Sequence, residues 1–184
     1  AFVATASCSE SRSAILTGLY PHQNGQIGLA THKYSMHRNC PNIPSLLKKQ
    51  GYRTGIIGKL HVNPESAFPF DFRWNDPGSC GFGHRDVRKI AEVAEEFITA
   101  SDEPFFLMVN YPDAHLPWLP RQEGLPQTLL AAKDVKTLPF AGVDVPRLRA
   151  CTADYYNCIR RLDTGIGMVL ESLAHAGRAQ NALV

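Results

Sequence analysis

Apolar and polar positions follow two different periods along the N-terminal half of the chain, and these periods predict helices and strands in turn. Residues 9–17 are helix formers with serine at the start and Gly18 just past the end, which predicts a short helix with Cys8 at its N-terminus. Residues 43–50 predict a second short helix, and the β-branched run at 52–57 predicts a strand. This half of the chain therefore contains a helix-then-strand unit.

The same alternation recurs in the C-terminal half, with longer elements. A helix predicted over 85–101 has one apolar face, and the apolar run 105–109 predicts a buried strand. A pattern with steps of three and four then predicts a long amphipathic helix from Arg147 to Gly177, followed by a strand that begins at 181–184. The apolar faces comprise Val87, Ile90, Ala94, Phe97 and Ile98 in the first helix, and Leu148, Cys151, Tyr155, Ile159, Leu162, Ile166, Val169 and Leu173 in the second.

A proline-containing segment, residues 112–146, shows little periodicity, which predicts a long irregular loop over the strand ends. Helices that alternate with apolar strands favour an α/β fold in which a mostly parallel sheet is flanked by helices. The chain begins without Met and closes on a predicted strand. We therefore expect residues 1–184 to be the central portion of one domain, truncated at both ends and without a second domain.

Composition excludes several classes of protein. Lys and Arg number 19 and Asp and Glu 17, so the formal net charge of +2 indicates neither nucleic acid nor an anionic membrane as a partner. With 44% hydrophobic and 20% charged residues, the chain has the composition of a folded globular protein, and its longest apolar run is too short for a membrane span. The five cysteines form no C-x-x-C pair, which argues against a zinc ribbon and a complete disulfide framework.

The candidate chemistry begins at Cys8, because a side chain at a helix N-terminus meets free backbone N–H groups and the positive end of the helix dipole. Arg12 follows four residues later, so its guanidinium can return to the same face and hold a tetrahedral anion such as sulfate or phosphate. A cysteine-based phosphatase loop is excluded, because it needs more residues between cysteine and arginine than the three found here. Taken alone, a buried cysteine beside a surface arginine is the simpler explanation.

Other reactive residues have plainer explanations. Lys59 and His61, taken alone, would be a strand-end lysine and a loop histidine in water. Three loop histidines near Cys40 could suggest zinc, but their spacing matches no known ligand pattern. Cys151 and Cys158 are expected to pack in the core. The loop histidines are His22, His32 and His37. Arg160 and Arg161 are expected on a solvated face, and Cys80 has no assigned role.

Four motifs together resemble the sulfatase family and cover nearly the whole chain. Residues 8–18 resemble the family signature, in which the cysteine is oxidised to formylglycine, and residues 18–25 are similar to the segment that follows it. Residues 51–61 are similar to the family's strand that ends in G-K-x-H. Residues 113–118 resemble a P-H-x-P motif in which Ala114 replaces the first proline.

This resemblance implies an alkaline-phosphatase-like fold and a site of five residues. Cys8, oxidised to formylglycine, supplies an aldehyde hydrate that attacks sulfur while calcium, Arg12 and Lys59 neutralise the sulfate oxygens. His61 is expected to deprotonate the hydroxyl group whose collapse expels sulfate, and His115 to bind a sulfate oxygen or to protonate the leaving group. The family's calcium ligands lie outside this window, so no metal ligand is expected here apart from Cys8 after its conversion.

The resemblance also implies a substrate class. Residues 59–65 and 68–72 most resemble the branch of the family that acts on N-sulfated glucosamine, so a sulfated sugar is the expected partner. A periplasmic, secreted or lysosomal location follows by family resemblance, and an exposed sheet edge would allow a homo-oligomer. Glu10 departs from the signature, which has proline or alanine there. Two readings therefore stay open: a sulfohydrolase, or a non-catalytic fragment or interaction module on the same scaffold.

Overall fold

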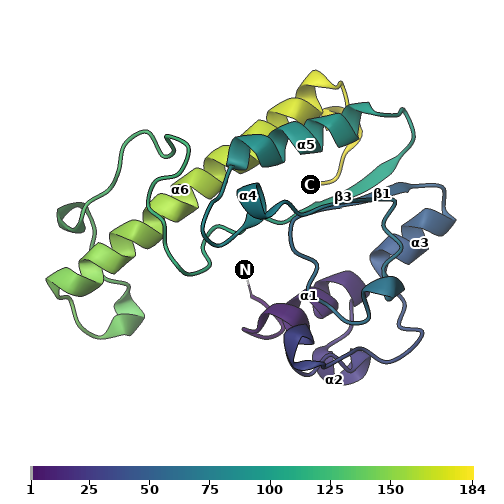
Figure 1. Ribbon diagram of the computed structural model, residues 1–184, viewed down its shortest axis with the longest axis horizontal. Helices are drawn as coiled ribbons and strands as arrows, with labels where there is room; N and C mark the ends of the chain where they lie inside the picture. The colour runs from purple at the N-terminus through teal and green to yellow at the C-terminus, as the bar shows by residue number, and fades with distance from the viewer. Residues whose placement is uncertain (1) are drawn as a thin grey trace. The chain divides into compact units, whose positions relative to one another are not determined.

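The computed structural model describes residues 2–184, which form two compact units (Figure 1). Unit 1 comprises Ala1–Trp74 with Asp102–Met108, and unit 2 comprises Asn75–Ser101 with Val109–Val184. Each unit has buried side chains of its own. Within the described residues, no helix combines the length and the apolar character needed to cross a membrane.

Unit 1 is built on a small sheet whose strands lie in the order β2–β1–β3, with β1 at Arg53–Ile57, β2 at Phe72–Trp74 and β3 at Phe105–Val109. β1 and β2 run parallel, with Ile56 opposite Arg73. The central strand β1 is buried from its second residue onward, whereas every residue of β3 is half-buried. The strand predicted over 105–109 is therefore present, but it is less buried than expected.

Two α-helices of unit 1 lie within one residue of their predicted bounds. α1 (Cys8–Thr17) stops at Gly18, whose φ of 70° lies in the left-handed region that glycine tolerates best. The single turn α2 (Pro21–Asn24) follows. α3 (Ile43–Lys49) begins after Asn42, whose side-chain oxygen accepts a backbone N–H of the first turn at 3.0 Å. The helices predicted over 9–17 and 43–50 are thus confirmed.

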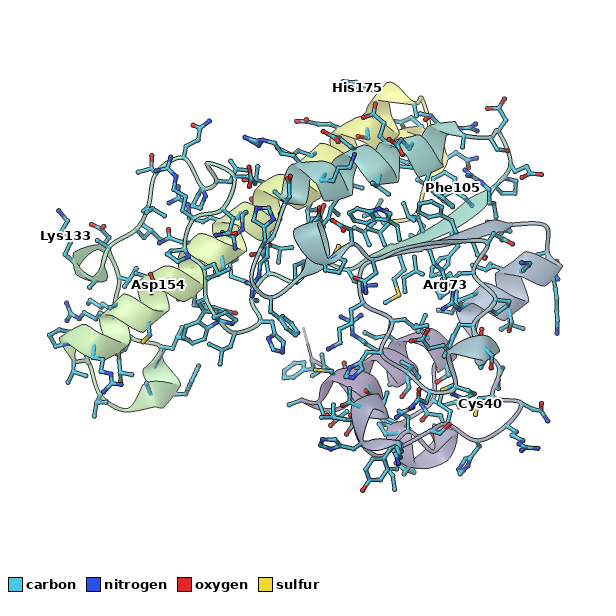
Figure 2. All side chains as sticks on the ribbon, viewed as in Figure 1. Cys40, Arg73, Phe105, Lys133, Asp154 and His175 are labelled. Atoms are coloured by element: carbon cyan, nitrogen blue, oxygen red, sulfur yellow. The ribbon has the colours of Figure 1, made fainter. Side chains whose placement is uncertain are left out.

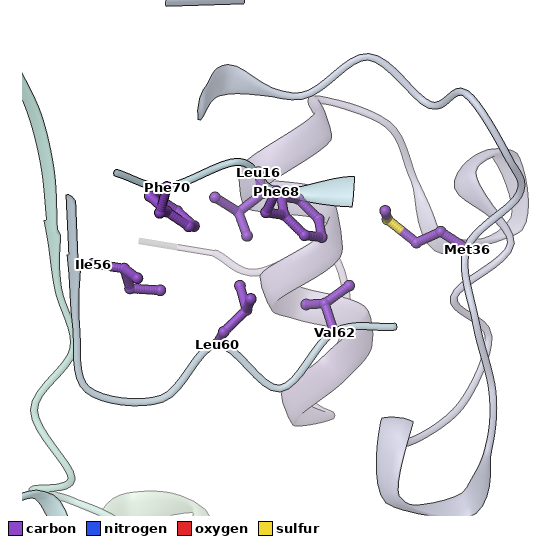
Figure 3. Packing of buried hydrophobic residues seen from close by; sticks show 7 residues of the cluster. All are labelled: Leu16, Met36, Ile56, Leu60, Val62, Phe68 and Phe70. Atoms are coloured by element: carbon purple, nitrogen blue, oxygen red, sulfur yellow. The ribbon is translucent and has the colours of Figure 1, made fainter. Parts of the chain in front are cut away.

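The hydrophobic core of unit 1 lies between α1, β1 and the segment that leads into β2 (Figure 3). Leu60 and Val62 point into this cluster from the segment just after β1, and Val62 is completely buried. The cluster consists of Leu16, Met36, Ile56, Leu60, Val62, Phe68 and Phe70. Since apolar burial is the main stabilising term in folding, these contacts anchor the segment that also carries Lys59 and His61.

Unit 2 contains α4 (Pro77–Cys80), α5 (Val87–Thr99) and α6 (Pro146–His175). α5 begins at Asp86, whose carboxylate accepts two backbone N–H groups of the first turn. Residues 110–145 carry only short 3₁₀ turns, which confirms the predicted irregular loop. Figure 2 labels Lys133 on this loop and Asp154 on α6. The predicted apolar face of α5 is confirmed, because all five of its residues are buried: Val87, Ile90, Ala94, Phe97 and Ile98.

The predicted long helix is confirmed as α6, but its buried face differs from the predicted one. Cys151 and Ile166 were expected on the apolar face and are exposed. Arg161 was expected in solvent and is buried, whereas Arg160 is exposed. Small and polar side chains dominate the buried positions because partners in the preceding loop satisfy the polar ones. The buried residues are Ala153, Asn157, Cys158, Arg161, Gly165, Ser172 and Leu173.

The prediction of a strand at 181–184 is wrong. A 3₁₀ turn at Ala179–Asn181 follows α6, and the residues after it are exposed and form no strand. Leu183 and Val184 are among the most exposed apolar side chains of the chain. An apolar run favours a strand only where neighbouring strands and a core are available, and none pairs with this segment in the described structure.

Candidate active site

α1 carries Cys8 and Arg12 one helical turn apart. Cys8 is the first residue of the helix and is half-buried, at the end where backbone N–H groups lack helical acceptors. Arg12 donates a hydrogen bond from Nη1 to the backbone oxygen of Lys59 at 2.6 Å. Burial lowers the pKa of the Arg12 guanidinium, and attraction to Cys8 partly opposes this shift. The arginine therefore links the start of α1 to the segment after β1.

Glu10 lies in the same helical turn. Its carboxylate accepts a hydrogen bond of 2.6 Å from the hydroxyl group of Ser7, the residue just before the helix. Acidic groups in a first turn are also favoured by the helix dipole. Glu10 therefore stabilises the start of α1 at the position where the family signature has proline or alanine.

Lys59 and His61 lie just beyond the carboxyl end of β1. The Gly58 N–H donates to the backbone oxygen of Trp74 at 2.7 Å, and Gly58 then turns the chain with a φ of 81°. His61 has a φ of 54°, which is uncommon for a residue other than glycine and recurs at functional sites. In open α/β sheets, ligands bind beyond the carboxyl ends of the strands.

The ring of His61 lies in a cationic neighbourhood. Burial is the largest cause of its lowered pKa, and the positive charges of Lys59 and Arg12 lower that pKa further. The carboxylates of Glu10 and Glu65 act in the opposite direction but more weakly. The His61 ring therefore loses its proton more readily than an ordinary histidine does.

A buried amide network supports this region, and the sequence reasoning did not identify it. The Asn24 side chain donates to the Ser13 hydroxyl at 3.0 Å, and the Gln26 side-chain oxygen accepts the N–H of Asn63 at 3.1 Å. Asn63 in turn donates to the backbone oxygen of Ala30 at 2.9 Å. Asn24 and Gln26 are completely buried, so these bonds fix the loops around α1. Their only sequence signal is a place in or beside the second of the four motifs.

His115 lies in unit 2, on the loop after β3. Its exposed ring stacks on Phe82, with ring centroids 4.5 Å apart and 24° between the planes. Its Nδ1 lies 2.6 Å from the backbone oxygen of Leu116. A carbonyl oxygen can only accept, so the proton of the neutral ring is on Nδ1 and its Nε2 can accept another.

A buried ion cluster in unit 2 fixes the loop of His115. Arg85 donates from Nη2 to the backbone oxygens of His115 and Pro117, both at 2.9 Å. Arg161 of α6 forms an ion pair with Asp113, and Arg85 Nη1 lies 3.7 Å from the same carboxylate. All three charged side chains are completely buried. No sequence signal pointed to this cluster, because its members are far apart along the chain.

The structure places the predicted site residues in two groups. Cys8, Arg12, Lys59 and His61 lie together in unit 1, joined by the Arg12 hydrogen bond to Lys59 and by the charges that act on His61. His115 lies in unit 2. The four residues of unit 1 form a group that is suited to an anion, because it combines two positive charges with a helix N-terminus.

The described residues do not fit a calcium ion by themselves. Among residues 2–184, no three His, Cys, Asp or Glu side chains lie close enough to hold a metal ion, and the five cysteines are free thiols. Asp71 accepts the N–H of Thr54 at 3.0 Å and pairs with Lys48, while Asp113 pairs with two arginines. A hard divalent cation needs several oxygen ligands, so its ligands would have to come from elsewhere.

A cavity of about 310 Å³ in unit 1 lies against α1 but contains none of the five site residues. Its lining is mostly apolar or small, and Ile15 and Tyr20 there are more than half exposed. The full lining is Phe2, Val3, Ala4, Ser11, Ala14, Ile15, Gly18, Leu19 and Tyr20. This cavity is therefore separate from the four site residues of unit 1.

Known proteins are similar in sequence to this chain over its whole length. The Sulfatase family model matches residues 1–184. Human N-sulphoglucosamine sulphohydrolase is 34% identical over 214 aligned positions, which cover 100% of this chain and 41% of the human protein. The chain thus spans about two fifths of the length of that curated relative.

Solved structures share the fold at lower sequence identity. A protein solved in complex with its substrate D-glucosamine-2-N,6-O-disulfate aligns with a TM-score of 0.70 at 18% identity, over 98% of this chain and 55% of its own. Phosphonate monoester hydrolase of Agrobacterium radiobacter also aligns with a TM-score of 0.70 at 18% identity, over 97% of this chain and 52% of its own. The predicted α/β fold with a parallel sheet and flanking helices is thereby confirmed.

The resemblance carried by the four motifs is confirmed as well, because the family model and the human relative both extend over the entire chain. For the family in general, membership implies a formylglycine and a metal ion. The α/β fold, the signature cysteine at a helix N-terminus and the matches from end to end agree with one another, and the chain belongs to the sulfatase family.

Proposed function

We propose that the protein containing this chain is a sulfohydrolase that releases sulfate from N-sulfated glucosamine. The observation that carries the proposal is the cationic group at α1, where Arg12 contacts the backbone of Lys59 and both charges act on His61. A sulfo group is a tetrahedral anion, and positive charges beside free helix N–H groups suit such an anion. The 34% identity to human N-sulphoglucosamine sulphohydrolase supports the same chemistry.

Arg12 and Lys59 hold the sulfo group and neutralise its oxygens. Burial removes water from around the Arg12 guanidinium, which strengthens its attraction to an anion. The hydrogen bond to the Lys59 carbonyl keeps the guanidinium in one orientation. Fixed charges of this kind lower the activation barrier most where negative charge develops during bond cleavage.

Cys8 is the position of the nucleophile. Formylglycine at this position would supply an aldehyde hydrate, which offers one hydroxyl group for attack on sulfur and another for release of sulfate. The half-buried setting of Cys8 at the helix N-terminus fits this group, because free N–H donors face the developing charge. Calcium is the metal ion that we propose for the complete protein, with ligands from residues other than those of this 184-residue chain.

The N-sulfo preference rests on two similarities. The human relative is an N-sulphoglucosamine sulphohydrolase, and the solved neighbour was bound to a glucosamine that carries both N- and O-sulfo groups. Sulfate release from N-sulfo and from O-sulfo glucosamine by a full-length protein tests the proposal, with faster release expected from the N-sulfo sugar. Release from the O-sulfo sugar alone would contradict the N-sulfo preference, and release from neither sugar would contradict the sulfohydrolase.

Glu10 favours a second candidate function, a non-catalytic protein that binds sulfated sugars. This carboxylate occupies the signature position that the cysteine-converting enzymes read, and it is engaged with Ser7. With Cys8 left as a thiol, Arg12 and Lys59 would still attract a sulfo group. Calorimetric binding of glucosamine N-sulfate without any sulfate release would identify this function.

A further inference from the structure

An exposed aromatic side chain, Phe82, lies beside a site residue in unit 2. Phe82 is 48% exposed, and its ring stacks on the His115 ring with the two centroids 4.5 Å apart. Leu116, the residue after His115, is 60% exposed. Exposed apolar side chains that gather next to a polar site residue are typical of surfaces that a ligand covers.

The loop between α4 and α5, which carries this aromatic ring, is closed at its base. Residues 81–86 connect the two helices, and Cys80 and Arg85 pair with each other as an antiparallel β-bridge. The N–H of Asp86 also donates to the backbone oxygen of Ser79 at 3.1 Å. These ties limit the conformations that the backbone can adopt, so the loop holds its ring in a defined place.

The same loop is anchored to the loop of His115. The buried guanidinium of Arg85 donates to the backbone oxygens of His115 and Pro117, both at 2.9 Å. His84 adds a second tie, because its Nε2 lies 2.6 Å from a carboxylate oxygen of Glu123 in the loop after β3. The stacked rings are therefore supported by contacts on both loops, which distinguishes them from a chance contact of two surface side chains.

Two glycines flank the ring in the sequence, at positions 81 and 83. A Cβ atom at position 81 would lie 2.2 Å from the backbone oxygen of Pro77, so the fold excludes a side chain there. A Cβ atom at position 83 would meet no atom within 4 Å. The loop thus presents one aromatic side chain between two positions without side chains, and a ligand can approach Phe82 closely.

We propose that Phe82 binds the sugar ring of the substrate, with the phenyl ring packed against C–H groups of the pyranose. This inference rests on the proposed function for its ligand. The face of an aromatic ring is negative and attracts the weakly positive C–H groups of a sugar, and their contact removes apolar area from water. A solved neighbour was bound to a sulfated glucosamine, and the stack on His115 places the contact beside a site residue. Phe82 therefore makes the site selective for sulfo groups that a sugar carries.

Binding of glucosamine N-sulfate to a full-length Cys8→Ala protein, which does not consume the sugar, tests the contact directly. We expect the pyranose C–H proton signals to move upfield in nuclear magnetic resonance, because the ring current shields protons above an aromatic face. Phe82→Ala in the same background should reduce this shift and raise the calorimetric Kd about tenfold. An unchanged Kd or an unchanged proton shift in Phe82→Ala would overturn the proposal.

Two further variants separate the ring from general effects of substitution. Phe82→Tyr keeps an aromatic face, so its Kd should stay within about twofold of the value with phenylalanine. Phe140→Ala is the matched control, because it removes another phenylalanine of unit 2 that is 87% exposed, and it should leave the Kd unchanged. Binding by Phe82→Tyr as weak as that of Phe82→Ala, or an equal loss in Phe140→Ala, would overturn the role of the Phe82 ring.

Inorganic sulfate separates a sugar contact from an effect transmitted through His115. Sulfate has no C–H groups, so Phe82→Ala should leave its inhibition constant unchanged, while the KM for glucosamine N-sulfate rises about tenfold and kcat is retained. Equal weakening of sulfate and sugar would show that Phe82 only orients His115, and would overturn the sugar contact. Failure of the proposed function differs from both results: a protein with Phe82 intact that neither binds nor hydrolyses the sugar would contradict the sulfohydrolase as well as this inference.

Discussion

Lys59 lies two residues after the end of the buried strand β1, and its charge, like that of Arg12, lowers the pKa of His61. We expect Lys59→Ala to lower kcat/KM for sulfate release about tenfold or more, equivalent to about 1.4 kcal/mol of transition-state stabilisation. Lys49→Ala, on the exposed end of α3, is the matched control and should leave kcat/KM unchanged. Equal losses in both variants of a full-length protein would contradict the anion-binding role of Lys59.

Two histidines of the chain should respond to pH in opposite directions. Burial and neighbouring positive charges lower the pKa of His61, whereas a backbone hydrogen bond and Glu123 raise the pKa of His84. As the pH falls below the unfolded value of about 6.5, the unfolded chain protonates at position 61 before the folded one, so stability is lost. At position 84 the folded chain holds the proton more tightly, so stability is gained on acidification and lost as the pH rises through its folded pKa.

Urea denaturation at about pH 7.5 and about pH 5.5, on either side of the unfolded pKa, checks both signs. On acidification, His61→Gln should lose less stability than the wild type, and His84→Gln should lose more. If the free energy of unfolding of both variants changes with pH as that of the wild type does, then neither environment shifts the pKa of its histidine as described.

At the residue scale, the family resemblance led to the expectation that five side chains form one site, whereas helix and strand signals alone favoured plainer explanations for Lys59 and His61. Cys8, Arg12, Lys59 and His61 lie in unit 1 at a helix start and beyond a strand end, and His115 lies in unit 2. The contact of Ser9 with His61 joins residues 52 positions apart. A serine in a helix start has many possible partners, so the sequence alone did not predict this one.

Gly165 of α6 occupies a position where α6 meets α5 and the Tyr111 ring within unit 2. A Cβ atom at position 165 would lie 2.8 Å from a ring carbon of Tyr111 and 2.9 Å from the Cβ of Val87. We therefore expect Gly165→Ala to destabilise the fold by about 1–3 kcal/mol through overpacking.

Gly167→Ala is the control on the same helix, because a Cβ there meets no atom within 4 Å. It should raise stability by about 0.5–1 kcal/mol, since alanine favours helices more than glycine does. Denaturant midpoints of both variants measure the difference. Two substitutions with the same sign would contradict the close approach at Gly165.

At the element scale, the positions of the amphipathic helices were easier to predict than the identity of their buried residues. The face of α5 follows directly from apolar spacing, because its partners are also apolar. The buried face of α6 includes Arg161, whose burial depends on Asp113, 48 residues away in the loop. An apolar period cannot reveal a position that is buried through an ion pair.

At the scale of the whole molecule, the chain spans about two fifths of the length of its human relative. Among residues 2–184, no three His, Cys, Asp or Glu side chains lie close enough to hold a metal ion. We expect the 184-residue chain to bind calcium far more weakly than a full-length protein does. Its candidate ligands Asp71 and Asp113 already form ion pairs with lysine and arginine side chains. Calorimetric titration of both proteins with calcium measures this difference. Binding of equal strength would show that carboxylates within this chain complete the site.

The central claim is that sulfate release depends on Cys8 converted to formylglycine at the start of α1. Mass spectrometry of the peptide that contains residue 8, taken from a full-length protein that hydrolyses glucosamine N-sulfate, tests this claim most directly. The account predicts the mass of formylglycine at position 8 in the active protein. An unmodified thiol at Cys8 throughout a protein that turns over substrate would contradict it.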